Sequence, residues 1–206
     1  MRAAIIGMGA MGKKHYHTVL NSDKVSLAGV VDAESDNLRN LGANTYADVE
    51  GLLEHEELDL AIVATPTTTH FEIATKLINK MDFLAQKKKC KAVVGHVERF
   101  NPAIQAILPE LRDQNILYCS TTRMSPYPRR ITDVGVKLDL GIRDVDLIRL
   151  LTRKRIKECF ENSHASRSDL EDTATFTMKL EDDTMAIAAT SWLFPFRERR
   201  VKILTQ

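Results

Sequence analysis

The sequence predicts an α/β protein in two parts: a doubly wound parallel sheet with helices on both faces, then an α+β domain with a mostly antiparallel open sheet. Two observations predict this order. As far as residue 80, short apolar runs alternate with segments of helical spacing, which is typical of parallel βαβ units. Beyond that, strand-like runs follow one another closely, which is typical of antiparallel hairpins. We place the domains at residues 1–96 and 97–206.

A glycine-rich turn joins the first predicted strand to the first predicted helix, residues 13–20. Gly7 allows the tight turn, Gly9 lets backbone N–H groups approach phosphates without a Cβ in the way, and Gly12 lets the helix pack close to the sheet. The helix N-terminus adds unpaired N–H donors and a partial positive charge. The turn is therefore predicted to hold the pyrophosphate of a dinucleotide. Its residues are Gly7, Met8, Gly9, Ala10, Met11 and Gly12.

An acidic residue follows the turn at the expected distance. Asp32 lies about 20 residues after Gly12 and closes the second predicted strand, residues 25–31. Its carboxylate can accept hydrogen bonds from both hydroxyls of an adenosine ribose, whereas a 2′-phosphate there would meet like charge. The G-x-G-x-x-G pattern in this context predicts a Rossmann domain that binds NAD in preference to NADP.

Caps and apolar runs indicate the other elements of the first domain. Gly42 is placed to end one helix and Asp48 to begin the next. An almost entirely apolar run is typical of a strand buried on both faces. The predicted elements are a helix at 33–41, a strand at 45–46, a helix at 49–54, a strand at 58–64 and a helix at 71–80.

The alternation breaks after residue 80. Residues 81–91 continue with helical character where a turn and a strand are expected, and an apolar strand is predicted only at 92–94. Two helices in succession indicate that a strand is missing near residues 81–82. The run Lys87, Lys88 and Lys89 is interpreted as a solvated helix end, with phosphate binding as the alternative.

The second domain mixes helices with closely spaced strands. The two strands flanking residues 181–183 are predicted to form a hairpin. Because the last predicted strand enters a sheet and nothing returns from it, the domain is interpreted as truncated. The predicted helices are 103–112 and 139–151, and the predicted strands are 116–124, 157–165, 173–180, 185–193 and 200–204.

Charge and cysteine content narrow the possible partners. With 29 basic and 28 acidic residues the net charge is +1, which argues against nucleic acid and anionic membranes and in favour of small molecules and self-association. Cys90, Cys119 and Cys159 are isolated, as expected in a reducing compartment. No apolar run approaches the roughly 18 residues of a membrane span. We expect a cytoplasmic protein, without a metal site since no cluster has metal-ligand spacing.

Taken together, these motifs resemble the Gfo/Idh/MocA oxidoreductase family. The resemblance runs almost from end to end and depends on motifs in a fixed order. Residues 129–136 with 139–142 look most like members that act on UDP-N-acetylhexosamines. The motifs are Gly7–Gly12 with His15, Asp32, residues 64–67 with His70, residues 95–102, Asp139–Asp146 and Glu171–Asp172.

The resemblance implies a hydride passed between the nicotinamide C4 of NAD and a carbinol carbon of a sugar, with copies of the chain associating through the second sheet. Asp139 and Arg143 stand at the family's catalytic positions. The nicotinamide ring must lie across the carboxyl ends of the parallel strands, where residues of the polar turn after 58–64 line it: Thr65, Pro66, Thr67 and His70. The substrate residues implied are His96, Arg99, Asn101, Asp133, Lys137 and Asp144.

Two departures bear on catalysis. The Glu-Lys-Pro motif that carries the family's catalytic lysine is absent, at the junction where a strand is missing. Arg143 stands where the family has histidine, and arginine stays protonated, so it can hold a substrate oxygen or phosphate but cannot be the base. Asp139 or Asp144 could substitute only in part. The alternatives are therefore a non-catalytic homologue that binds NAD or a sugar nucleotide, and a sequence from which segments of a longer protein are omitted.

Several single residues keep two interpretations. His70 either caps its turn or lines the cofactor cleft. His96 and Arg99 serve the cleft or an interdomain salt bridge with Glu98 or nearby acids. Asp133 and Lys137 contact substrate or make local turn bonds. Trp192 is interpreted as packing or a subunit contact rather than a stacking surface, and His15 and His17 as structural or surface groups.

Overall fold

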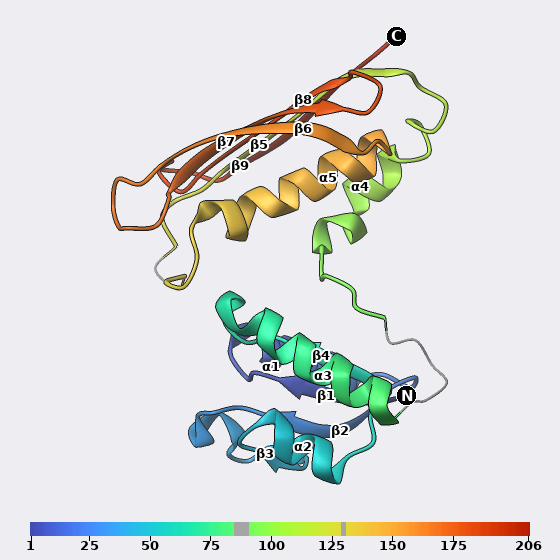
Figure 1. Cartoon of the computed structure of the whole chain (residues 1–206), viewed down its shortest axis with the longest axis vertical. Coiled ribbons are helices and arrows are strands. Elements are labelled where there is room, and N and C mark those ends of the chain that lie inside the picture. The colour runs from blue at the N-terminus through green and yellow to red at the C-terminus, as the bar shows by residue number, and fades with distance from the viewer. Residues whose placement is uncertain (85–90, 129–130) are drawn as a thin grey trace. The chain divides into compact units, whose positions relative to one another are not determined.

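The computed structural model describes residues 1–84, 91–128 and 131–206 (Figure 1). The chain divides into two compact units, Met1–Val93 and Val94–Gln206. The first contains a parallel Rossmann sheet and the second a mixed, mostly antiparallel sheet, which confirms the predicted fold class. Among the described residues no helix is long and apolar enough to cross a bilayer.

The first unit is a four-stranded parallel sheet in the order β3-β2-β1-β4. Its core has two layers because helices cover both faces: one layer includes Ile5, Tyr16 and Val30, and the other includes Ile6 and Leu52. Asp48 caps α2 as predicted, accepting from Gly51 N at 2.7 Å. The elements are β1 (Arg2–Ile6), α1 (Ala10–Leu20), β2 (Ser26–Val31), β3 (Thr45–Tyr46), α2 (Val49–His55), β4 (Leu60–Val63) and α3 (His70–Leu84).

The predicted helix at 33–41 is wrong. The segment forms only a 3₁₀ turn at Ser35–Leu38, and Gly42 does not end a helix. The cause is local, because the Asp32 carboxylate accepts from the Glu34 N–H and from the Asn37 side chain. Such side-chain bonds compete with the backbone bonds of a helix.

The predicted strand at 92–94 is also wrong. Val93 and Val94 are 89% and 71% exposed and belong to no strand. A parallel strand needs a neighbour for its backbone groups, and β4 is an outer strand of the described sheet. Helix α3 does continue to Leu84 as predicted, whereas Cys90 and the run Lys87, Lys88 and Lys89 lie outside the described residues.

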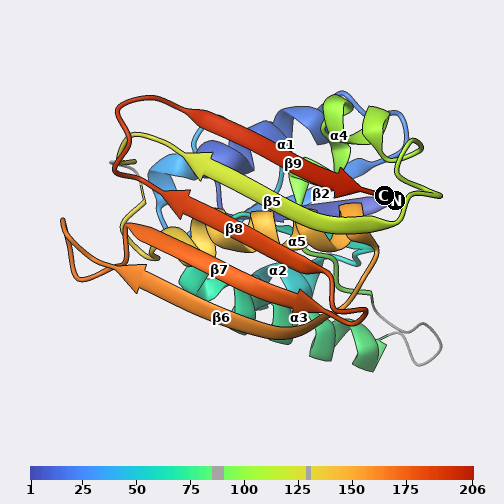
Figure 2. The same cartoon turned by 90° about the horizontal axis from the view of Figure 1, so that it is seen from above.

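The second unit is a five-stranded sheet in the order β6-β7-β8-β5-β9, with one helix-covered face (Figure 2). Of the strand pairs described in this sheet, only β5–β8 is parallel. Strands β7 and β8 form the predicted hairpin, and Asp183 in its turn has φ 66°. The α-helix predicted from 103 stops early, at Ile107, two residues before Pro109, which cannot donate a helical bond. The elements are α4 (Pro102–Ile107), β5 (Ile116–Met124), α5 (Ile142–Thr152), β6 (Ile156–His164), β7 (Thr173–Leu180), β8 (Met185–Ser191) and β9 (Glu198–Thr205).

Candidate functional site

The glycine turn after β1 is closely packed on two sides. Gly7 has φ +92°, donates its N–H to Val31 O at 2.8 Å, and lies so close to the next turn that a Cβ would come within 2.8 Å of Thr65 N. A Cβ on Gly12 would lie 1.8 Å from Gly7 O. The turn therefore brings the start of α1 and the end of β4 against one another, as the fingerprint predicts.

The middle glycine is different, because a Cβ on Gly9 would meet nothing within 4 Å. Gly9 is the N-cap of α1 and provides no side-chain cap, and the first turn carries no acidic residue. Ala10 and Met11 are exposed there. Open space beside a helix N-terminus with free N–H groups fits the pyrophosphate of a dinucleotide.

Asp32 is fixed beside this turn. Its Oδ2 accepts from Met8 N at 2.6 Å, and its Oδ1 accepts from Glu34 N at 2.9 Å and from the Asn37 amide at 3.2 Å. Burial opposes ionisation of the carboxyl, but these hydrogen bonds hold the pKa of Asp32 below its ordinary value. The side chain is thus a charged, oriented acceptor.

The polar turn after β4 is held by its own side chains. Thr69 Oγ1 donates to Pro66 O at 2.8 Å and shares a 2.7 Å hydrogen bond with Thr65 Oγ1. His70 Nε2 lies 2.8 Å from Thr65 O, and since a carbonyl only accepts, Nε2 carries the proton. Of the two interpretations of His70, this geometry supports capping of the turn. Pro66 and Thr67 remain exposed at the carboxyl end of β4.

The predicted catalytic pair lies in the second unit, where a π-helical turn at Lys137–Gly141 leads into α5. Arg143 donates to Asp139 Oδ1 at 3.0 Å across one helical turn, and the two side chains are 38% and 10% exposed. Lys137 Nζ lies 3.5 Å from Glu161 Oε1, while the Lys137 N–H donates to Glu171 Oε1 at 3.4 Å. Asp133 is half-buried in the preceding loop.

Asp144 is placed differently from its neighbours on α5. It is 1% exposed, and Arg123 Nε donates to its two oxygens at 2.9 and 3.1 Å. Burial raises the pKa of Asp144 to about 6, although Arg123 favours its charged form. Arg123 also donates to Glu98 Oε1 at 2.9 Å, and Asn101 donates to Glu98 Oε2 at 3.1 Å. The predicted substrate residues Asn101 and Asp144 therefore belong to a buried ion network.

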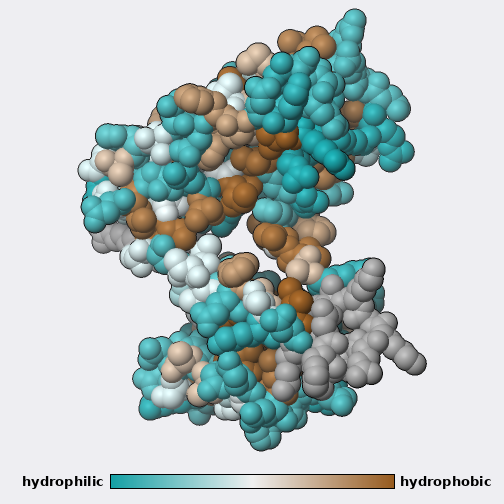
Figure 3. Space-filling view, in the orientation of Figure 1, coloured by the Kyte–Doolittle hydropathy of each residue, from teal (hydrophilic) through white to brown (hydrophobic). Residues whose placement is uncertain are grey.

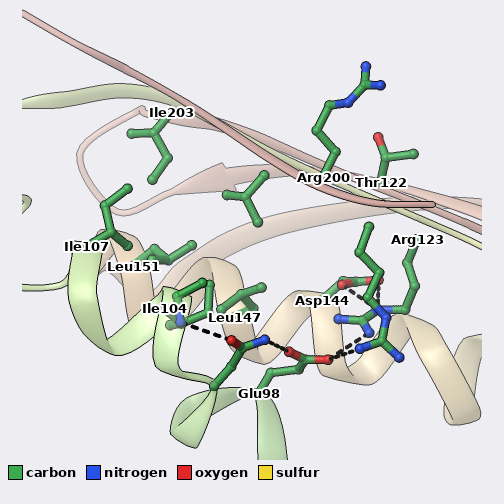
Figure 4. A pocket seen from close by; sticks show the side chains of 14 residues that line it. Glu98, Ile104, Ile107, Thr122, Arg123, Asp144, Leu147, Leu151, Arg200 and Ile203 are labelled. Atoms are coloured by element: carbon green, nitrogen blue, oxygen red, sulfur yellow. Dashed lines mark hydrogen bonds and ion pairs between the residues drawn. The ribbon is translucent and has the colours of Figure 1, made fainter.

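This network forms the polar end of a pocket of about 410 Å³ within the second unit (Figure 4). Arg199 also lines the pocket. The Arg200 side chain points away from it (Figure 4). Figure 3 shows hydrophobic side chains gathered between the sheet and the helices of this unit. The apolar lining residues are Ala103, Ile104, Ile107, Leu147, Leu151, Val201 and Ile203.

His96 and Arg99 both interact with the carboxylate of Asp146. Arg99 binds Asp146 through two hydrogen bonds of 2.8 and 2.5 Å, and His96 Nε2 lies 3.8 Å from the same Asp146. Burial opposes ionisation, but the Arg99 hydrogen bonds and nearby positive charge lower the pKa of Asp146. For His96 and Arg99 the alternative interpretation was an interdomain salt bridge with Glu98 or nearby acids. The carboxylate that both residues contact is Asp146, which lies in the same unit.

Sequence reasoning missed Arg123 as the centre of the buried network. A signal was present, because Cys119, Thr121 and Arg123 alternate along one face of β5 and are all buried. A charged residue on the core face of a strand requires buried carboxylate partners. Among the described residues no group of three or more His, Cys, Asp or Glu side chains could hold a metal ion.

The fold and the glycine turn define a class of NAD-binding oxidoreductases, and comparison with known families identifies it. Residues 1–87 match the oxidoreductase family described as having an NAD-binding Rossmann fold, and residues 113–206 match the GFO/IDH/MocA C-terminal domain. The chain belongs to the Gfo/Idh/MocA family of NAD-dependent oxidoreductases, which act on CH–OH groups.

Several of the relatives that the chain matches are named as dehydrogenases of a nucleotide sugar, a sugar or an inositol. UDP-N-acetylglucosamine 3-dehydrogenase of Acidithiobacillus ferrooxidans is 29% identical over 100% of this chain and 72% of its own. Inositol 2-dehydrogenase 2 of Saccharopolyspora erythraea is 23% identical over 90% of this chain, and the rhizopine catabolism protein MocA of Rhizobium meliloti is 25% identical over 73%. The chain spans 65% and 57% of those two proteins.

Solved structures agree on the fold. A structure of the Acidithiobacillus ferrooxidans enzyme matches 100% of this chain and 72% of its own at 28% identity, with a TM-score of 0.84. GenD2 from gentamicin A biosynthesis, solved in complex with NAD, matches 100% of this chain and 70% of its own with a TM-score of 0.87. At 18% identity, the latter supports the fold alone.

Proposed function

We propose that this chain is an NAD-dependent dehydrogenase that oxidises or reduces a secondary alcohol of a nucleotide-linked sugar. The observation that carries the proposal is the open space at Gly9 beside the fixed carboxylate of Asp32, since both fit NAD. The nucleotide-linked sugar is supported by the relative named UDP-N-acetylglucosamine 3-dehydrogenase, which aligns over the whole chain.

Within this proposal each group has a role. NAD, when bound, supplies a nicotinamide C4 that exchanges a hydride with the carbinol carbon. The start of α1 holds the pyrophosphate, Asp32 the ribose, and Thr65, Pro66 and Thr67, in the turn that His70 caps, the nicotinamide side. The residues on the substrate side are His96, Arg99, Asn101, Asp133 and Lys137. Ion pairs orient some of these side chains.

The alcohol proton needs an acceptor. Arg143 stays protonated and therefore holds a substrate oxygen. Asp144 is buried and bound by Arg123, so it positions that side chain instead of reaching substrate. Asp139 is the remaining acceptor in the pair, and it is oriented by Arg143.

The test is the appearance of reduced nicotinamide when the purified protein is mixed with NAD and UDP-N-acetylglucosamine. We expect turnover that Asp139→Asn lowers by about a hundredfold or more, within the range for loss of a general base. The matched control is Asp113→Asn, an exposed aspartate between α4 and β5 of the same unit. Turnover unaffected by Asp139→Asn would contradict the role given to that carboxylate.

The alternative function is binding of NAD or a sugar nucleotide without chemistry. It is favoured by Arg143, by the absence of a Glu-Lys-Pro motif from the sequence, and by the alignment with the Acidithiobacillus protein. That alignment extends over 229 positions against 206 residues here, so at least 23 positions have no counterpart in this chain. Tight NAD binding with no turnover on any nucleotide sugar would favour this alternative.

The proposal includes association of copies through the second sheet. Strand alternation puts Phe160, Met185 and Leu204 on the face away from the core, where they are 66%, 51% and 56% exposed. Exposed apolar side chains on one sheet face favour contact with another protein surface. Light scattering during gel filtration measures the assembly, and Phe160→Asp should dissociate it.

A further inference from the structure

Three loops meet at one end of the second sheet, where β5, β8 and β6 end (Figures 1 and 2). Tyr127, after β5, packs edge-to-face on Trp192, after β8, with ring centroids 5.6 Å apart. Its hydroxyl donates to Ser168 Oγ, in the β6–β7 loop, at 3.3 Å. Phe194 N donates to Ser125 O at 3.3 Å. These contacts join the three loops into one platform, which we call the loop platform.

A buried carboxylate orders the part of the platform that carries Arg167. Asp172 is fully buried, and its Oδ2 accepts from Ser166 N, Ser166 Oγ and Arg167 N at 2.9, 2.7 and 3.0 Å. The Arg167 guanidinium then lies 5.6 Å above the Tyr127 ring. Among the described residues no carboxylate forms an ion pair with Arg167, which is exposed, so its guanidinium can accept an anionic partner.

The platform also carries an uncovered aromatic pair. Phe194 and Phe196 pack edge-to-face with centroids 6.0 Å apart, yet they are 37% and 57% exposed. An exposed aromatic face stacks well on a nucleobase, and a pre-oriented guanidinium matches a phosphate group. A nucleoside diphosphate presents both features in one molecule.

The loop platform adjoins the predicted catalytic pair. Trp192 and Val136 share a core cluster with Tyr127 and with Leu140, and Leu140 follows Asp139 in the π-helical turn. A group bound on the platform would therefore lie at the same end of the unit as Asp139 and Arg143.

We infer that the loop platform is the site for the nucleoside diphosphate part of the substrate, with Arg167 on a phosphate and the Phe194–Phe196 pair on the base. The inference rests on the proposed nucleotide-linked substrate. It assigns recognition of the nucleotide to residues separate from the Asp139–Arg143 pair. Nucleotide binding should therefore be measurable without NAD and without turnover.

The test is calorimetric titration of the full chain with UDP, which lacks the sugar. UDP should bind, and Arg167→Gln should weaken it about tenfold, the loss expected for one charge-assisted contact. Phe196→Ala should weaken it about fivefold or more. The matched control is Arg155→Gln, because Arg155 is exposed just before β6, at the opposite end of the sheet. That control should leave the affinity unchanged.

Titration with uridine, which lacks the phosphates, distinguishes a loss of ligand recognition from a loss of folding. The affinity for uridine should fall with Phe196→Ala but not with Arg167→Gln, a split that general loss of structure would not produce. UDP that fails to bind, or that binds Arg167→Gln as well as wild type, overturns the inference. An unchanged UDP affinity in Phe196→Ala, together with an altered oligomeric state, makes the aromatic pair a subunit contact and overturns the base-binding half.

The two proposals fail in different ways. UDP binding that depends on Arg167, without reduced nicotinamide from any sugar, keeps the inference and removes the dehydrogenase. Reduced nicotinamide from a sugar, without UDP binding, keeps the dehydrogenase and removes the inference.

Discussion

Gly9 and Gly12 stand three residues apart in opposite surroundings, which gives a matched pair of variants. Gly9→Ala should change the free energy of unfolding by no more than about 1 kcal/mol, because its φ of −64° suits alanine and the new methyl meets no atom. It should weaken NAD binding about tenfold, because the methyl occupies the space for the pyrophosphate.

Gly12→Ala should act on the fold instead. Its Cβ would lie 1.8 Å from Gly7 O, so backbone must move, at a cost of about 2 kcal/mol or more. Urea unfolding and calorimetric titration with NAD measure both variants. Equal NAD affinity for Gly9→Ala and wild type would contradict the placement of the pyrophosphate.

Arg143 offers a test of whether a histidine at this position raises the rate. Arg143→His puts a side chain that titrates near neutral pH one helical turn from Asp139, and the carboxylate can orient its imidazole. The turnover rate with NAD and nucleotide sugar should rise about tenfold or more. Arg143→Gln is the control, since it removes the charge without supplying a base. A rate that falls equally in both variants would mean that the arginine itself is required.

Among the elements, the sequence predicted those whose signals are local. The hairpin of β7 and β8, the cap at Asp48 and the glycine turn each depend on neighbouring residues, and each is present. The predictions for residues 33–41 and 92–94 were wrong. In the first segment a side chain accepts a backbone hydrogen bond that a helix would need, and for the second no described partner strand exists.

The candidate site likewise has a part that local sequence spacing predicts and a part that it does not. The Asp139–Arg143 pair follows from helical spacing of four, so sequence was sufficient. The partners of Arg123 and Arg99 are 21 and 47 residues distant, and only the packing of α5 against β5 and the segment before α4 brings them together. Long-range ion pairs of this kind have no spacing rule, although a charge on the core face of a strand shows that one is needed.

The β6–β7 loop should respond to pH through Asp172. Burial opposes its ionisation, but hydrogen bonds from Ser166 and Arg167 hold the pKa of Asp172 below its ordinary value. A lowered pKa contributes stability that is complete above the unfolded value and is lost as pH falls through the folded value. The stability advantage of wild type over Asp172→Asn should therefore be constant from pH 7 to about 5 and shrink below about 4. Urea unfolding across this range measures it, and a constant difference down to pH 3 would contradict the assignment.

At the scale of the whole molecule, each unit has a core of its own. Units with separate cores can unfold separately, and a ligand stabilises only the unit to which it binds. At a hundredfold excess over its dissociation constant, NAD should add about 2.7 kcal/mol to the first unit. For a unit of this size that raises the midpoint of unfolding by about 10 °C or more.

Trp192 makes the distinction measurable. It is the single tryptophan of the sequence and is buried in the second unit, so its fluorescence follows that unit alone. NAD should move one calorimetric transition upward while the midpoint followed by Trp192 stays fixed, and Gly9→Ala should reduce the shift to about half at the same NAD concentration. A fluorescence midpoint that rises together with the calorimetric one would show that the two units unfold as one, and that NAD stabilises the second unit through the first.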